Sequence, residues 1–413
     1  MSLKIVSQLK DSVAAMLSGI DLSNVSDVNG GFQRAFTTML QKADVPEASG
    51  IQNITLYSGV FNYAIDAKIF GTAINDIRPQ GISRNPNNFV TKVNQEDFDR
   101  TKNYFYPSGT MSTFEYNLGV PTIRIVAPFP KQQDIIDPMN ATSGWSVGGN
   151  ASGLAQDVTV FYQSPASLRF TLTGASTGTL SKTLNSTSLS TYQGVGVAFL
   201  AIEMPSTTTA TNLTSIELRL GSSASNYNSV TATTGFLGSW VAGNWLLVAF
   251  DFSTATTVGT PNWSAITYTD LVFTTTGDIV NFRTGGLWIS YPTPAQILYQ
   301  SAAIFLPTGT SVPLTTITAD SDSIMLTDPA YNIYQYECAI AVCQMVGGTS
   351  GSATIATFES ALNGARARNG QVINLGLYDL YRGRNPTEEL PKIGSYYSND
   401  TGYGYGGFYG RNY

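Results

Sequence analysis

Residues 135–307 form the part of the sequence that most restricts the fold. They carry only 4 basic and 7 acidic side chains and are rich in Ser, Thr, Gly and Asn. Short runs that alternate apolar with polar residues follow one another, separated by turn-forming residues, and no helical periodicity interrupts them. This pattern predicts an antiparallel β-sandwich or jelly roll, with Thr-rich outer faces in place of charged ones.

Seven runs of strand length mark the expected sheets. Glu217 and Arg219 lie two residues apart in one of them, so they face the same side of the strand and are predicted to form an ion pair. The runs cover residues 157–162, 167–174, 194–202, 215–221, 244–252, 269–276 and 286–291.

Helical patterns occur on both sides of this β-rich stretch. Apolar residues recur at three- and four-residue steps between Leu3 and Ile20, and a second amphipathic pattern begins after Asp27, a good N-cap. Residues 328–346 open with Asp-Pro and show helical spacing, and residues 353–367 are expected to form a partner helix. We therefore expect helices to bracket the β-rich region.

The expected fold is α+β and multidomain. Hairpins are predicted at 54–65 and 112–128, which makes the N-terminal part helical with a small β region. The first and last parts are expected to form one discontinuous base domain into which the sandwich is inserted. The expected parts are 1–134 and 308–393 for the base, 135–307 for the inserted jelly-roll sandwich, and 394–413 for a flexible Tyr/Gly-rich C-terminal tail.

The sequence has no histidine among its 413 residues. This removes Ser-His-Asp and Cys-His catalysis and His-ligated metals. A pair of carboxylates could still act as acid and base, but no spacing in the sandwich favours it. We therefore expect a protein that is not an enzyme and that uses no cofactor and no metal.

Overall charge and hydropathy exclude further partners. The net charge of −6 argues against a broad phosphate-binding surface, so no sequence-specific nucleic-acid partner is expected. The N-terminus lacks the apolar core of a signal peptide and no apolar run is long enough to span a bilayer, so we expect a soluble protein made in a cytoplasm, without a membrane partner. Cys338 and Cys343 are predicted to be two buried thiols.

All five tryptophans lie within residues 135–307. An exposed indole face can stack on a sugar ring while amides and hydroxyls orient it, so these residues raise the possibility of glycan binding. Trp245 and Trp288 lie in apolar strands and are assigned to the core. Trp145, Trp240 and Trp263 lie in Gly-, Asn- and Ser-rich contexts and are the candidate glycan contacts, although core burial is the competing interpretation for them too.

Two C-terminal features are candidate interfaces. The last residues contain many Tyr and Gly but almost no aliphatic residue, so they cannot build a core of their own and either bind a neighbouring subunit or stay disordered. A basic cluster at Arg382 and Arg384 is equally compatible with an interface and with a solvated loop. The tail residues predicted to contact a neighbouring subunit are Tyr396, Tyr397, Tyr403, Tyr405, Phe408, Tyr409, Arg411 and Tyr413.

The residues also carry a resemblance to known proteins. The stretch 32–85, which begins FQRAFTTMLQ, together with STFEYNLGVPTIRI at 112–125, resembles tailed-bacteriophage virion proteins in which two helices precede a small β region. The segments SGWSV, SPASLRF, SIELRLGSSASNY, NWLLVAFDF and GTPNWSAITY resemble the jelly-roll modules, akin to carbohydrate-binding and lectin-like sandwiches, that such proteins carry as inserts.

The resemblance implies a non-enzymatic structural subunit of the virion, assembled in the host cytoplasm. It would form a homo-oligomeric ring as a neck, head-to-tail connector (adaptor) or tail component, with portal, tail or neck subunits as neighbours and the sandwich projecting outward. The alternative is a lectin-like host-glycan-binding or capsid-decoration protein in which the sandwich binds surface glycans and the helices only anchor it.

Overall fold

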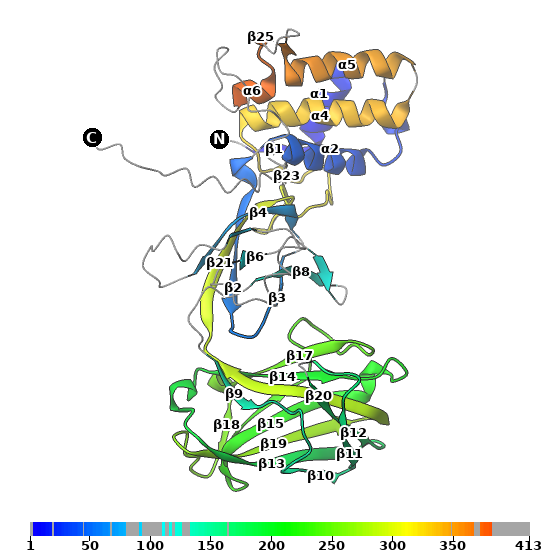
Figure 1. The fold of residues 1–413 in the computed structure, drawn as a ribbon. Coiled ribbons are helices and arrows are strands. Elements are labelled where there is room, and N and C mark those ends of the chain that lie inside the picture. Colours follow the sequence, from blue (N-terminus) through cyan, green and yellow to red (C-terminus); the bar gives the residue numbers. More distant parts are fainter. Residues whose placement is uncertain are drawn as a thin grey trace, which may run out of the picture. The chain divides into compact units, whose positions relative to one another are not determined.

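A computed structural model describes residues 3–18, 20–43, 45–66, 68–79, 91–92, 110–111, 115–117, 120–125, 133–162, 165–347, 349–366 and 372–381. The chain divides into two compact units (Figure 1). The first combines residues 1–49 with 300–413, and the second comprises residues 50–299. The fold is therefore α+β, with a unit whose described residues are mostly β-strands inserted into a unit that contains α1, α2, α4, α5 and α6.

Two antiparallel sheets form the sandwich in the second unit. One has the order β10-β13-β19-β15-β16-β18 and the other β11-β12-β20-β14-β17, with β9 beside the C-terminal half of β20. Their strands are β9 (Gln133–Asp137), β10 (Trp145–Gly149), β11 (Ala151–Asp157), β12 (Ser167–Leu172), β13 (Thr177–Thr187), β14 (Val197–Glu203), β15 (Leu213–Ser223), β16 (Asn226–Ala232), β17 (Trp245–Asp251), β18 (Thr256–Val258), β19 (Ile266–Thr275) and β20 (Ile279–Ser290).

Alternation explains how these strands pack. Along β15 and β17 every second residue is buried, as the sequence pattern predicts for strands with one face on a core. The buried faces meet in an apolar core where the rings of Phe170, Phe273 and Phe282 lie 5.2 to 5.4 Å apart, centroid to centroid. The predicted β-sandwich is confirmed.

Two details of the strand prediction need correction. The run 157–162 was expected to be a strand, but β11 ends at Asp157 because its carboxylate turns back to accept hydrogen bonds from the backbone N–H groups of Thr159 and Val160. Strands β9, β10, β13, β16 and β18 were missing from the prediction; in β13 and β16 the Ser-, Thr- and Asn-rich sequences lack a clear apolar alternation.

A smaller β region belongs to the same unit as the sandwich. Its hairpin of β7 and β8 confirms the one predicted within 112–128. This region belongs with the sandwich to residues 50–299, whereas the expected base domain extended to residue 134. The helical unit takes only residues 1–49 from the N-terminal part. Its strands are β2 (Ser49–Leu56), β3 (Asn62–Ala64), β4 (Ile69–Pro79), β5 (Thr91–Lys92), β6 (Thr110–Met111), β7 (Glu115–Asn117), β8 (Val120–Arg124) and β21 (Thr293–Ser301).

The helical unit is built around α4 (Asp328–Val346). This helix is apolar on nearly all sides, as expected for a helix surrounded by others, and α1, α2, α5 and α6 all contact it. The other elements are α1 (Val6–Met16), α2 (Val28–Lys42), α5 (Thr349–Asn363), α6 (Leu377–Tyr381), β1 (Lys4–Ile5), β22 (Phe305–Leu306), β23 (Ser323–Ile324), β24 (Ala365–Arg366) and β25 (Val372–Asn374).

Several local predictions hold in this unit. Asp27 is the N-cap of α2, and its carboxylate accepts a hydrogen bond from the N–H of Gly30 at 3.0 Å. Cys338 and Cys343 are both free and buried. None of the helices within the described ranges is both long and apolar enough to cross a bilayer.

A buried carboxylate joins three elements of the helical unit. Glu337 on α4 is 2% exposed, and its Oε1 accepts hydrogen bonds from Lys42 Nζ at 2.8 Å and from the Tyr378 hydroxyl at 2.7 Å. The two donors come from α2 and α6, so this single oxygen links segments from both ends of the chain. Arg382, Arg384 and the tail 394–413 lie outside the described residues.

Candidate functional site

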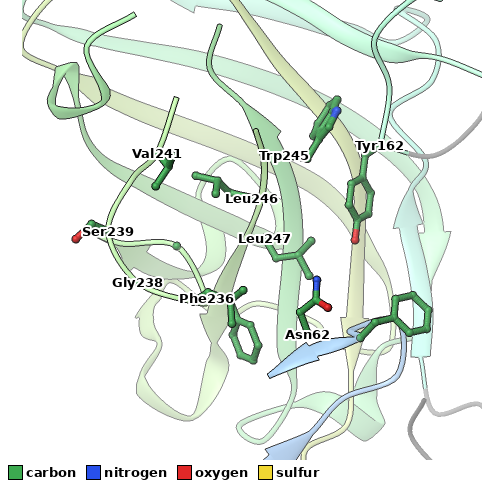
Figure 2. Close-up of a pocket in the computed structure, with 12 residues that line it drawn as sticks. Asn62, Tyr162, Phe236, Gly238, Ser239, Val241, Trp245, Leu246 and Leu247 are labelled. Atoms are coloured by element: carbon green, nitrogen blue, oxygen red, sulfur yellow. The ribbon is translucent and has the colours of Figure 1, made fainter. Parts of the chain in front are cut away.

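A pocket of about 230 Å³ lies in the second unit, where the loop before β17 approaches strand β3 (Figure 2). The loop contributes Gly238, Ser239 and Val241 on one side, and Tyr162 lies on the other. Its remaining lining residues are Phe61, Asn62, Gly235, Phe236, Leu237, Trp245, Leu246 and Leu247.

Backbone hydrogen bonds hold the loop in place. The N–H of Phe236 donates to the carbonyl oxygen of Leu247 at 2.7 Å, and the N–H of Gly238 donates to Gly235 at 3.1 Å to close a tight turn. Gly238 has a φ of 136°, a backbone conformation that residues with a side chain rarely adopt. The loop is therefore anchored directly to strand β17, which carries Trp245.

Aromatic rings line the pocket and continue beneath it. Tyr162 lies 5.7 Å from Trp245, centroid to centroid, and its ring is stacked with that of Trp288 at 6.4 Å. Phe199 continues the series, 5.8 Å from Trp288 and 5.6 Å from Phe236. Such a continuous set of rings gives the pocket stiff walls with large apolar faces.

Gly285 on β20 makes room for these rings. A Cβ atom at this position would lie 3.1 Å from a ring carbon of Trp245 and 3.1 Å from the Cβ of Tyr162. The absence of a side chain therefore lets the two aromatic residues approach each other over the sheet.

Two polar side chains in the pocket, Asn62 and Tyr162, could hydrogen-bond to a ligand. Asn62 Oδ1 is buried and accepts no hydrogen bond from any described residue. Burial raises the pKa of Tyr162 to about 12, so its hydroxyl stays protonated at neutral pH. In Figure 2 the Tyr162 hydroxyl and the Asn62 amide both point toward the pocket interior. A buried amide oxygen without a partner costs free energy, and a ligand hydroxyl could satisfy it.

Among the described residues that line this pocket, none has a charged side chain. Arg283, on the same sheet, is held between two carboxylates, with its Nε 2.8 Å from Asp157 Oδ2 and its Nη1 bonded to Glu203 Oε2. Burial would raise the pKa of Asp157, but hydrogen bonds from Thr159 and Arg283 outweigh it and keep that pKa below its ordinary value. The guanidinium is thus already neutralised and is not available to an anionic ligand.

The structure places two of the predicted glycan contacts in the core. Trp145 is 6% exposed and Trp263 is 4% exposed. Their indole N–H groups donate to Asp137 Oδ1 at 3.3 Å and to Asn228 Oδ1 at 3.0 Å. Neither residue offers a free ring face, so the structure corrects the expectation that they could stack on a sugar.

Trp240, the third candidate, is partly buried against the sandwich core. It lies next to Ser239 of the pocket but does not line it, and its buried Nε1 has no hydrogen-bond acceptor among the described residues. Trp245 and Tyr162, which do line the pocket, were not among the site residues predicted from the sequence. The apolar run around Trp245 suggested a core position, and no sequence signal connects that run to Asn62.

Other candidate groups have ordinary structural roles. Glu217 and Arg219 form the predicted ion pair, at 2.9 Å between Oε2 and Nη2. Asp322, in the acidic loop at residues 320–322, accepts hydrogen bonds from the backbone N–H groups of Thr318 and Ala319, which supports a structural role for this loop. The described residues contain no group of three or more potential metal-ligating His, Cys, Asp or Glu side chains.

No family model and no curated protein matches the chain. Among solved structures, a family 11 carbohydrate-binding module from Clostridium thermocellum, in complex with a β-1,3-1,4-mixed-linked tetrasaccharide, is similar at 10% identity, over 40% of this chain and 94% of the module, with a TM-score of 0.26. A family 30 module of a Clostridium thermocellum cellulase is similar at 17% identity, over 39% and 96%, with a TM-score of 0.26. A further carbohydrate-binding module of the β-sandwich superfamily has 14% identity, over 59% and 99%, with a TM-score of 0.27.

Proposed function

We propose that this protein binds glycans without turning them over and that the aromatic pocket beside β17 is the binding site. The observation that carries the proposal is that one pocket combines aromatic walls with Asn62 Oδ1, a buried acceptor to which no described residue donates a hydrogen bond. A sugar ring has apolar C–H faces and hydroxyl edges, so it can pack on Trp245 and donate to the amide oxygen at the same time.

The experiment is a glycan array followed by titration calorimetry on the full chain. We expect saturable binding that Trp245→Ala weakens by about tenfold or more, because the largest apolar face of the pocket is lost. The matched control is Tyr291→Ala, which removes a 42% exposed aromatic residue that does not line the pocket. An array without any bound glycan would contradict the proposal.

We further propose that the glycan-binding unit is carried by a structural subunit of a phage virion. The observation that favours this second function is the insertion: residues 1–49 and 300–413 share one unit, and the unit that contains the sandwich is placed between them in the sequence. An inserted module suits a base that assembles while the insert remains accessible. In this proposal the subunit is a homo-oligomeric neck, connector or tail component, and residues 394–413 contact a neighbouring copy.

Mass photometry and electron microscopy of the purified chain test the structural function. We expect a closed homo-oligomer, and we expect deletion of residues 394–413 to weaken assembly without changing the melting temperature. A strictly monomeric chain at micromolar concentration would argue against the ring, and unaltered assembly of the deletion variant would exclude the tail as its contact.

A further inference from the structure

We infer that the pocket binds a single, uncharged hexopyranose residue, and that strand β3, outside the sandwich, determines this specificity through Asn62. The inference rests on the glycan-binding function proposed above and specifies its ligand. It draws on three properties of the pocket: its volume, the absence of charge among its described lining residues, and the origin of its walls.

The volume corresponds to one six-membered ring with substituents. An apolar cavity of about 150 Å³ holds a benzene ring, and drug-sized ligands occupy pockets of about 300 to 1,000 Å³. The pocket volume of about 230 Å³ lies between these values. One pyranose residue can therefore enter, and further residues of an oligosaccharide would remain outside.

The lining favours a neutral ligand. The described lining side chains are aromatic, aliphatic, hydroxyl or amide groups, and none is charged. A carboxylate would lose its hydration in this pocket without a cation to replace it, since Arg283 is already paired with Asp157 and Glu203. Uronic and sialic acids are therefore excluded on electrostatic grounds, whereas the hydroxyls of a neutral hexose can pair with Asn62 and Tyr162.

Asn62 reaches the pocket from outside the sandwich. Strand β3 pairs with β8 in the register Asn62 to Arg124, and the N–H of Ile125 donates to the carbonyl oxygen of Phe61 at 2.8 Å. The ring of Tyr63, on the same strand, lies 6.0 Å from Phe236 of the pocket loop. Because these contacts hold β3 against the loop, the Asn62 amide has a defined position and can select for a hydroxyl.

Two comparisons on the full chain test the inference. On the unaltered protein, calorimetry compares methyl β-glucoside and methyl β-galactoside with the corresponding methyl uronides, which differ only by a carboxylate at C6. We expect binding of at least one neutral glycoside and a loss of about tenfold or more for its uronide, as expected for an unpaired charge.

The second comparison uses the variant Asn62→Ala with Asn185→Ala as its control, because Asn185 is an exposed asparagine on β13 of the same unit. We expect Asn62→Ala to weaken monosaccharide binding roughly fivefold to tenfold, the effect of one hydrogen bond, and the control to leave it unchanged.

The outcomes separate the two proposals. Equal affinity for uronides, or an Asn62→Ala variant that folds and binds like the control, overturns this inference while glycan binding stands. Binding of oligosaccharides without measurable binding of any monosaccharide has the same consequence. Failure to bind any glycan overturns both, and the uronide comparison remains decisive if Asn62→Ala does not fold.

Discussion

The cores of the sandwich and of the helical unit differ in which parts of the chain supply their residues. The sandwich core is apolar and comes from one continuous stretch of chain, and the buried carboxylates at its margin, Asp157 and Glu203, are paired with Arg283 from the same stretch. The helical unit joins the two ends of the chain and keeps a carboxylate, Glu337, inside its core. Truncation of an apolar residue in the sandwich core costs free energy through lost packing volume, whereas Glu337 links segments that are separated in sequence by the long insertion.

The largest expected effect is a core truncation in the sandwich. Phe273→Ala should lower the free energy of unfolding by about 3 to 5 kcal/mol, because the ring is fully buried between Phe170 and Phe282. Urea denaturation followed by circular dichroism measures the change. Val280→Ala, at a 55% exposed position, is the control and should stay within about 0.5 kcal/mol of the unaltered protein. Equal effects of the two variants would contradict the assigned core.

The corresponding change in the helical unit is Glu337→Ala. It leaves the Tyr378 hydroxyl buried without its acceptor and removes the partner of Lys42, so we expect a loss of about 2 kcal/mol. The loss is smaller than for Phe273→Ala because Lys42 is partly exposed and can turn to water. The matched control for Glu337→Ala is Glu359→Ala, which removes an exposed glutamate from helix α5. Differential scanning calorimetry measures the melting temperature of both variants. An unchanged melting temperature for Glu337→Ala would mean that the hydrogen bonds to Glu337 do not stabilise the helical unit.

Acid should weaken both units through one carboxylate in each. Burial would raise the pKa of Asp157 and of Asp322, but hydrogen bonds to their carboxylates outweigh it and lower both pKa values. Their stabilisation is complete above the pKa of an unfolded aspartate, about 3.9, and is lost as the pH falls through the lower folded values.

Melting temperatures measured from about pH 7 down to about pH 1.5, which covers the range below the unfolded pKa, test this expectation. Asp157→Asn should flatten the profile of the sandwich alone, and Asp322→Asn that of the helical unit alone. If both substitutions changed the same transition, the two carboxylates would not report on separate units.

The smallest effect on stability is expected at Gly285. Gly285→Ala forces Trp245 and Tyr162 to move by a few tenths of an ångström, so we expect a cost below about 1 kcal/mol. Affinity for a neutral hexoside should fall several-fold all the same, because both residues line the pocket. Calorimetric titration compares the variant with Ser152→Ala, an exposed change on β11. Unchanged affinity would mean that the ligand does not contact these two rings.

Sequence patterns were informative wherever the interaction is local. Alternation predicted the strands around Glu217 and Trp245, and Asp27 was predicted as a helix cap, because both depend on residues a few positions apart. The same patterns assigned Trp245 to the core and made Trp263 a candidate contact, whereas Trp263 is buried and Trp245 lines the pocket. Both lie in a β-rich stretch, and the polar neighbours of Trp263 suggested exposure, yet Asn228 satisfies its indole N–H within the core.

By itself, the sequence determined that the middle of the chain forms a β-sandwich, that helices flank it, and that histidine chemistry is absent. These properties follow from periodicity and composition, which need no knowledge of distant contacts. Only the tertiary structure decided which aromatic residues form a pocket and that Asn62 joins them. That pocket combines residues from β3, from the segment after β11 and from the loop before β17, and their proximity depends on how the sheets and the small β region pack together.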